Sequence, residues 1–300
     1  MDEFIFGIIL GLLSALFFAV QNVIIKWIGE DVRPVAANSI RVWISLPIIF
    51  FIAVNPFRQA NFALPMQTYV ALALSVFFAA GFGDVVFFQS QDRIGVSSAF
   101  AIANTYPMVT YFLAILFLGD LFIPVRFIGV ILAISGIILI SREQNKQYPD
   151  EDEEQLKGLD KLGYFMAASA AVMFALATIM VDIGTTVVDP LDANVIRLAC
   201  GSLMLVPTFY FSKRRGMRMP SRRGIKVVAG ASVVGMALAS TFWVASVKYV
   251  GATISAVLGS ISPLFALPLS LRYLAETVNW KVGLGTVSTI IGIWITLVAA

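Results

Sequence analysis

The sequence predicts an all-α polytopic membrane protein of ten transmembrane helices, arranged as two inverted five-helix repeats. Two observations carry this prediction: apolar runs about as long as a bilayer is thick, and a second half that matches the first at one constant offset. Of the 300 residues, 59% are apolar and 13% are charged, whereas soluble domains contain about 45–50% apolar and about 25% charged residues. A soluble fold could not bury this much apolar surface, so a lipid bilayer is the expected surrounding.

The apolar runs are predicted to form helices rather than barrel strands. A helix rises about 1.5 Å per residue, so about 20 residues cross a hydrocarbon core of about 30 Å. Residues 125–140 are apolar on nearly every face, whereas a barrel strand alternates over about ten residues. Charged, proline and polar clusters place the predicted spans near 4–28, 37–54, 68–90, 95–118, 124–141, 162–184, 192–211, 224–247, 250–273 and 279–299.

A shift of 156 residues aligns the second half with the first without a gap. Because 12 of the 300 residues are proline, a given proline would align with another proline by chance in about 4% of cases. At this one offset prolines, an asparagine and an arginine all align with residues of their own type, which indicates an internal duplication. We expect a first five-helix repeat at 1–141, a charged linker at 142–161 and a second five-helix repeat at 162–300. The matching positions are Gly7 with Gly163, Phe18 with Phe174, Pro34 with Pro190, Asn38 with Asn194, Arg41 with Arg197, Gly95 with Gly251, Pro107 with Pro263, Gly129 with Gly285 and Gly136 with Gly292.

The number of spans in each half predicts how the two halves are related. Five is an odd number, so the second half must enter the membrane from the opposite side. Inverted repeats related by an axis in the membrane plane are typical of secondary transporters, whose binding site lies near the midplane between the repeats. The duplication therefore favours a transport function.

Basic residues outside the spans are concentrated in one set of alternate loops. Sixteen Lys and Arg lie in the set that contains the linker and the loop at 213–226, and only Arg58, Arg126 and Lys248 lie in the other. The positive-inside rule predicts a cytoplasmic linker and both termini outside, in a multi-pass protein of the cell (plasma or inner) membrane.

Composition argues against several other kinds of function. The net charge of +3 is too small, and too concentrated in two loops, for nucleic-acid binding. Histidine is absent and cysteine occurs once, as Cys200, so we expect no His-based metal site, no Ser–His catalysis and no disulfide framework. No cofactor, metal or enzymatic activity is expected. The expected partners are a small-molecule substrate and the lipid bilayer, with protons and the oligomeric state left open.

Asp84 is the sharpest candidate for a functional residue. It lies near the middle of the third predicted span, where an ionised Asp costs about 2.5–3.5 kcal/mol on insertion scales. It should therefore face a cavity or a partner, as a proton-coupling or cation-binding group. The alternative is a carboxyl that bonds neighbouring helices and fixes their packing. Its repeat partner is Ser240, so a proton site here would be asymmetric.

Arg41 and Arg197 occupy equivalent places about one turn into the second and seventh spans. A guanidinium stays charged and can hold a carboxylate or phosphate through two parallel hydrogen bonds, which suits an anion-binding step or an ion-pair gate. Snorkelling to the interface is the other interpretation. Asp189 and Asp192 are close enough in sequence to Arg197 to be its structural partners.

Polar residues also gather around two prolines. Proline frees the carbonyl one turn back, so Pro107 and Pro263 are predicted to kink their helices and to gather polar atoms. Ordinary helix packing explains any single one of these residues equally well. The candidates for substrate contact are Asn22, Asn104, Tyr106 and Ser260, with Phe88 and Trp243 as aromatic walls.

Two similar runs suggest a family. The first is Gly119-Asp120-Leu-Phe-Ile-Pro-Val-Arg-Phe-Ile-Gly129, and the second is Ala275-Glu276-Thr-Val-Asn-Trp-Lys-Val-Gly-Leu-Gly285. Each resembles the end of an EamA domain, where an acidic residue closes the fourth helix and a Gly-rich fifth helix follows. Together with the paired prolines and glycines, the chain resembles the drug/metabolite transporter superfamily over its whole length.

This resemblance implies an exporter or exchanger of metabolites, with a central cavity walled mainly by helices 3, 4, 8 and 9. Substrates across the superfamily include amino acids, nucleotide sugars and phosphorylated sugars, so the resemblance does not name the cargo. Well-known ten-helix members are usually drawn with both termini in the cytoplasm, opposite to the count of basic residues. We expect a secondary transporter of a small polar metabolite, such as an amino acid or a related compound.

Two alternative functions stay open at this point. A passive solute channel would also need a polar path between the helices. An intramembrane aspartyl protease is suggested by Gly81-Phe82-Gly83-Asp84, which matches the G-x-G-D signature of that class. Such catalysis needs two carboxylates that share a proton, and the second Tyr-Asp pair and the Pro-Ala-Leu motif of the class are missing from this sequence.

Overall fold

The computed structural model describes residues 2–28, 34–145, 160–214, 216–217, 219–273 and 280–299, and the described residues form helices without strands. The predicted linker lies mostly outside these residues, as does the acidic block at 150–154. The first half contains α1 (Glu3–Ile28), α2 (Pro34–Ala53), α3 (Met66–Val76), η2 (Phe77–Gly83), α4 (Asp84–Ile94), α5 (Val96–Ala103), α6 (Tyr106–Phe117) and α7 (Pro124–Asn145). The second half contains α8 (Lys161–Thr185), α9 (Pro190–Arg214), α10 (Arg222–Ser232), η3 (Val233–Ala239), α11 (Ser240–Ser260), α12 (Ser262–Tyr273) and α13 (Trp280–Val298).

Nine segments of the described residues are long and apolar enough to cross a membrane. One of them, Arg222–Ala266, is 45 residues long and corresponds to two of the predicted spans. It folds back on itself, because Ser246 Oγ lies 3.0 Å from Ser255 Oγ, whereas nine residues of straight helix rise about 13.5 Å. The reversal falls at Gly251, whose φ of +81° is open to glycine and strained for other residues. The predicted all-α membrane fold of about ten spans is confirmed.

The two halves repeat their irregular features at the offset found in the sequence. The π-helical segments η2 and η3 begin at Phe77 and Val233 and are both seven residues long. Gly95 and Gly251 adopt φ values of +80° and +81° at the matching reversals. Because π-helical segments and left-handed glycines are rare, this agreement is independent support for the duplication.

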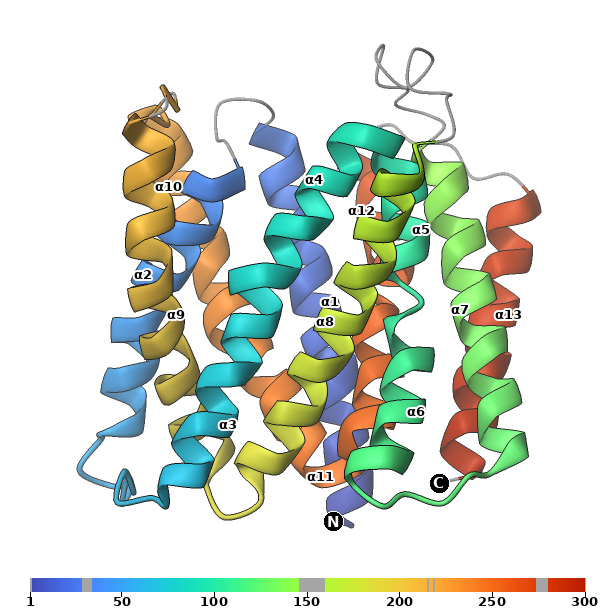
Figure 1. Cartoon of the computed structure of the whole chain (residues 1–300), viewed down its shortest axis with the longest axis horizontal. Coiled ribbons are helices and arrows are strands. Elements are labelled where there is room, and N and C mark those ends of the chain that lie inside the picture. The colour runs from blue at the N-terminus through green and yellow to red at the C-terminus, as the bar shows by residue number, and fades with distance from the viewer. Residues whose placement is uncertain are drawn as a thin grey trace.

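α7 and α13 pack antiparallel to each other, as two copies of one helix do when an in-plane axis relates them. Gly129 lies against Gly292, and Gly136 lies against Gly285. A Cβ atom on Gly129 would lie only 2.8 Å from the Gly292 carbonyl oxygen, so glycine allows this close approach. The halves are therefore inverted, and α7 and α13 stand side by side in Figure 1.

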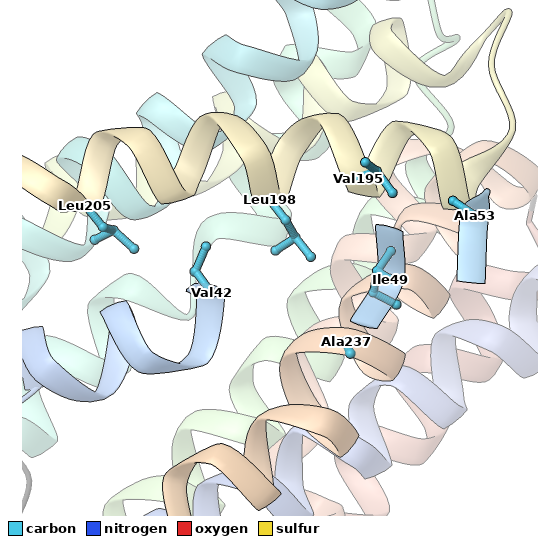
Figure 2. Packing of buried hydrophobic residues seen from close by; sticks show 7 residues of the cluster. All are labelled: Val42, Ile49, Ala53, Val195, Leu198, Leu205 and Ala237. Atoms are coloured by element: carbon cyan, nitrogen blue, oxygen red, sulfur yellow. The ribbon is translucent and has the colours of Figure 1, made fainter. Parts of the chain in front are cut away.

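The cluster between α2 and α9 shows the same relation in the core. Figure 2 shows Val42 beside Leu198 and Leu205, and Ala53 beside Val195, so the two helices run in opposite directions. Trp43 adds a hydrogen bond from Nε1 to the Ser202 carbonyl at 3.3 Å. This contact joins α2 of the first half to α9 of the second, the two helices that carry Arg41 and Arg197.

Both termini lie at one end of the bundle, with the α2–α3 and α8–α9 connections (Figure 1). We call this end the termini end, and the opposite end, where α7 ends and α8 begins, the linker end. An even number of crossings requires both termini on one side. Which end faces the cytoplasm stays a prediction, as do the exact limits of the two repeats and the linker.

Candidate functional site

A cavity of about 270 Å³ lies between the two halves. Ligand pockets commonly measure about 300–1,000 Å³, so this one suits a small molecule. The predicted spans 68–90, 95–118, 224–247 and 250–273 all contribute lining residues, as the resemblance implied. The helices α1, α8 and α9 complete the wall. Its lining residues are Phe18, Ala79, Tyr106, Phe174, Ala177, Thr178, Arg197, Met236, Ser240, Trp243 and Gly259.

Among the lining residues that the structure describes, Arg197 is the one that carries a charge, and neutral partners hold it in place. Its Nε donates to Ser75 Oγ at 3.0 Å, and its Nη1 donates to Asn194 Oδ1 at 3.3 Å. The guanidinium carbon lies 5.1 Å from the centre of the Trp243 ring, a cation–π geometry. Among the described residues no carboxylate forms an ion pair with it, so a fixed positive charge faces the cavity.

Four aromatic rings, those of Phe18, Tyr106, Phe174 and Trp243, form part of the remaining wall. Tyr106 is fixed by a 2.9 Å hydrogen bond from its hydroxyl to the Ala256 carbonyl and packs edge-on against Phe174, with ring centres 6.4 Å apart. Gly259 keeps the space open, because a Cβ atom there would lie 3.2 Å from the Tyr106 hydroxyl. The cavity is thus mainly apolar with one cationic corner.

The equivalent place in the first half is built from the same frame. Asn38 Nδ2 donates to Asp84 Oδ2 at 2.9 Å, and at the matching positions Asn194 Nδ2 donates to Ser240 Oγ at 2.8 Å. Arg41 lies within electrostatic range of the Asp84 carboxylate. The first half therefore carries its own carboxyl group near its arginine, and neither Arg41 nor Asp84 belongs to the cavity lining.

Arg41 differs from Arg197 in a second way. Its Nε is buried without a hydrogen-bond partner, whereas the Nε of Arg197 has Ser75. The residue equivalent to Ser75 is Ala231, which has no hydroxyl to offer. Arg197 is therefore the better positioned of the two guanidinium groups.

Ion pairs and a backbone hydrogen bond join the α2–α3 connection to the start of α9 at the termini end. Arg58 bridges Asp189 and Asp192, each at 2.5 Å, and the buried Asp192 also accepts from the Asn61 backbone N–H at 3.0 Å. The hydrogen bond to Asp192 raises the pKa of Arg58 above its usual value. The predicted pairing of Asp189 and Asp192 with Arg197 is wrong, because the α2–α3 connection folds over the start of α9 and brings Arg58 to both carboxylates.

Below the cavity, α11 closes against α8 and α9. Val244 and Val247 pack with Val181 and Val188, and Lys248 Nζ donates to the Val188 carbonyl at 2.7 Å. In the described part of the first half, α4 has no comparable interface with α1 or α2. At the linker end α4 is thus parted from α1 and meets α2 through the bond between Asn38 and Asp84, whereas the matching helices are packed together at the termini end.

The other predicted site residues lie outside the lining of this cavity. Asn22 is exposed on α1, and Phe88 packs against Phe87 with ring centres 5.8 Å apart. Asn104 donates to the Phe100 carbonyl at 2.9 Å, and the buried Ser260 donates to the Val257 carbonyl at 2.7 Å. A role for these four in substrate binding stays a prediction.

The two prolines follow breaks in their helices. Pro107 lies in the first turn of α6, directly after the interruption at Asn104 and Thr105. Pro263 lies in the first turn of α12, after Ile261. The breaks stand where kinks were expected, and a gating role for the prolines stays a prediction.

Sequence reasoning did not propose several residues that line the cavity. Phe18 and Phe174 appeared only as markers of the repeat, although their matched positions bring both rings to the cavity. Thr178, one turn after Phe174, had no local signal. Ser75, which positions Arg197, was hidden for the same reason, because its contact spans 122 residues of sequence.

Comparison with known proteins agrees with this architecture. The sequence model of the EamA-like transporter family matches residues 5–142 and 161–298. The chain belongs to the EamA-like transporter family. The resemblance to the drug/metabolite transporter superfamily is thereby confirmed, and the protein is a multi-pass membrane transporter.

Solved structures share the transporter's fold at low sequence identity. One protein of known crystal structure superposes with a TM-score of 0.74 at 13% identity, covering 97% of this chain and 96% of the other. This likeness concerns the fold alone. Among curated proteins no match is found.

Proposed function

We propose that this transporter is a secondary exporter or exchanger that works by alternating access around the Arg197 cavity. One observation carries the proposal: a cavity lined by both inverted halves lies where α11 packs on α8 and α9 at the termini end, whereas the described part of α4 has no comparable interface with α1 or α2 at the linker end. Exchange of these two arrangements between the halves would expose the cavity to one side at a time.

The lining supports a small metabolite with a polar head and an apolar body, such as an amino acid or a related compound. Arg197 offers the charge, while Phe18, Phe174 and Trp243 offer apolar contact. With the basic loops in the cytoplasm of the cell and both termini outside, as the positive-inside rule favours, the parted end faces the cytoplasm.

Counterflow in proteoliposomes tests the transport mechanism. Vesicles that hold the purified protein and an unlabelled amino acid mixture should accumulate the matching labelled substrate, with a rate that saturates. Arg197→Gln should abolish this accumulation. A flux that rises linearly with concentration and shows no counterflow would indicate a channel, and no flux of any amino acid, sugar phosphate or amine would contradict the proposal.

Asp84 is the candidate for proton coupling. It is a membrane carboxylate held between Asn38 and the charge of Arg41, so a change in its protonation would alter the interaction between α2 and α4. Asp84→Asn should abolish flux driven by a pH gradient and spare exchange. Asp92→Asn, which removes an exposed carboxylate from the same helix α4, is the control. Unchanged pH dependence in Asp84→Asn rules out this coupling.

The protease alternative has a separate test. Among the described residues, the charged neighbour that acts on Asp84 is the cation Arg41 rather than a second carboxylate. Cleavage of a model transmembrane peptide by the purified protein, lost in Asp84→Asn, would support proteolysis over transport.

A further inference from the structure

The two halves of the transporter build one polar frame and complete it differently. In each half an asparagine on the second helix donates to a side chain 46 residues later, which is Asp84 in the first half and Ser240 in the second. In each half an arginine lies one turn after the asparagine. The first half thus places a carboxyl group of the chain within electrostatic range of its arginine, and the second half has the arginine with a hydroxyl at the matching position.

The second half also lines the cavity at this place. Arg197 and Ser240 both belong to the lining, and Asn194 links them, because it accepts from Arg197 and donates to Ser240. The replacement of a carboxylate by the short hydroxyl of serine therefore leaves room beside a buried guanidinium. Burial of an arginine without an anion is unfavourable, which is a physical reason for a ligand to supply one.

We propose that the cavity binds a small carboxylate monoanion with an apolar body, whose carboxylate stands beside Arg197 as Asp84 stands beside Arg41. This inference rests on the proposed function and names the chemical class of its substrate. In the first half the matching asparagine and arginine have a carboxyl group, that of Asp84, as their neighbour. A ligand carboxylate would occupy the corresponding place beside Asn194 and Arg197 in the second half.

Charge and surroundings favour this class over others. A phosphate carries up to two charges, and the lining offers one cation. A sugar would need many hydrogen-bonding groups, whereas Phe18, Phe174, Met236 and Trp243 present apolar surface. None of the described lining residues is acidic, so an amino group on the ligand should add little to its affinity.

Equilibrium binding to the purified full-length protein in detergent tests the proposal. The probes are phenylacetate, its neutral match phenylacetamide, and the cation 2-phenylethylammonium. We expect phenylacetate to bind at least about tenfold more tightly than either of the others, as a charged hydrogen bond provides. Equal affinity of phenylacetate and phenylacetamide, or no binding of phenylacetate up to about 10 mM, overturns the proposal.

Two variants of Ser240 separate charge from size. Ser240→Asp restores the carboxylate of the first half and should reduce the preference for phenylacetate over phenylacetamide to less than about threefold. Ser240→Asn has the same size without the charge and should keep the preference, even if both affinities fall. A preference that survives in Ser240→Asp overturns the proposal. If that variant does not fold, Arg197→Gln must lose the preference instead.

These measurements are independent of transport. A carboxylate preference without counterflow would reject the proposed function and keep the ligand class. Counterflow of an uncharged or cationic substrate, with no carboxylate preference, would keep the proposed function and reject the ligand class.

Discussion

The cluster of Asn38, Arg41 and Asp84 and the cluster of Asn194, Arg197 and Ser240 occupy the same place in two copies of one fold. The asparagine bonds of 2.9 Å and 2.8 Å show that the backbone frame has been kept. What differs is the charge: one copy holds a carboxylate, and the other holds a hydroxyl that faces a cavity. The comparison teaches that a duplicated frame can keep its hydrogen bonds while one copy holds a carboxyl group away from the cavity and the other presents a hydroxyl in the cavity lining.

The largest expected effect separates the two arginines. Arg197→Gln should weaken phenylacetate binding about 100-fold, because it removes the charged hydrogen-bond donor from the cavity. Arg41→Gln should change that affinity less than about threefold. It should instead lower the melting temperature, because Asp84 loses its favourable interaction with the positive charge of Arg41. Calorimetric titration and thermal unfolding measure the two effects. Equal losses of affinity in both variants would end the distinction between the clusters.

A smaller effect tests whether the two chain reversals are equivalent. Gly95→Ala and Gly251→Ala should each destabilise the protein by about 1–3 kcal/mol, because both glycines adopt a φ near +80° that alanine tolerates poorly. Gly283→Ala is the control, since nothing lies within 4 Å of a Cβ atom there. Tryptophan fluorescence during unfolding gives the comparison. Sensitivity at only one of the two reversals would contradict the matched geometry.

The smallest effect concerns two matched contacts at opposite ends of the bundle. Gly163 packs against Arg93 and Ile94, and Gly7 packs against the equivalent Tyr249 and Val250. The linker-end contact adds an ion pair from Arg93 to Asp160 at 2.9 Å, and the termini-end contact adds a ring contact between Tyr249 and Phe6. Only the first should respond to pH.

The sign of that response follows from Asp160. The hydrogen bond from Arg93, aided by the backbone amides of Gly163 and Leu162, lowers the pKa of Asp160 below its usual value. Its stabilising effect is therefore complete above about pH 4, the pKa of an unfolded Asp, and is lost as the pH falls through the lower folded value. Asp160→Asn should melt earlier than the parent at pH 7 and together with it at the lowest pH. A gap that persists in acid would contradict this account.

The fold could be predicted from the sequence because its signals are repeated. Pro34 with Pro190 and Asn38 with Asn194 established the register, and the structure shows the same register in its π-helical segments and in Gly95 and Gly251. The π-helical segments themselves could not be predicted, since both consist of apolar residues and glycine, so that an extra residue per turn has no polar stripe to displace.

The site was predicted less completely than the fold. Tyr106, Arg197 and Trp243 were proposed as site residues and do line the cavity. For Arg197 the reason is that a charged side chain in a span usually faces the interior of the bundle. The partners of Arg197 were not foreseen. Ser75, which bonds to Arg197, comes from a segment far away in sequence, and so does Arg58, which pairs with Asp192. Both contacts depend on helix packing, which local sequence patterns do not contain.

Labelling of two matched loop positions tests the inverted duplication most directly. Phe57 is 99% exposed at the termini end, and the equivalent Lys213 is exposed at the linker end. With Cys200 replaced by serine, Phe57→Cys should react with a membrane-impermeant maleimide on intact cells, and Lys213→Cys should react only after permeabilisation. The reverse pattern would keep the inversion and overturn the predicted orientation. Reaction of both positions from the same side of the membrane would contradict the account.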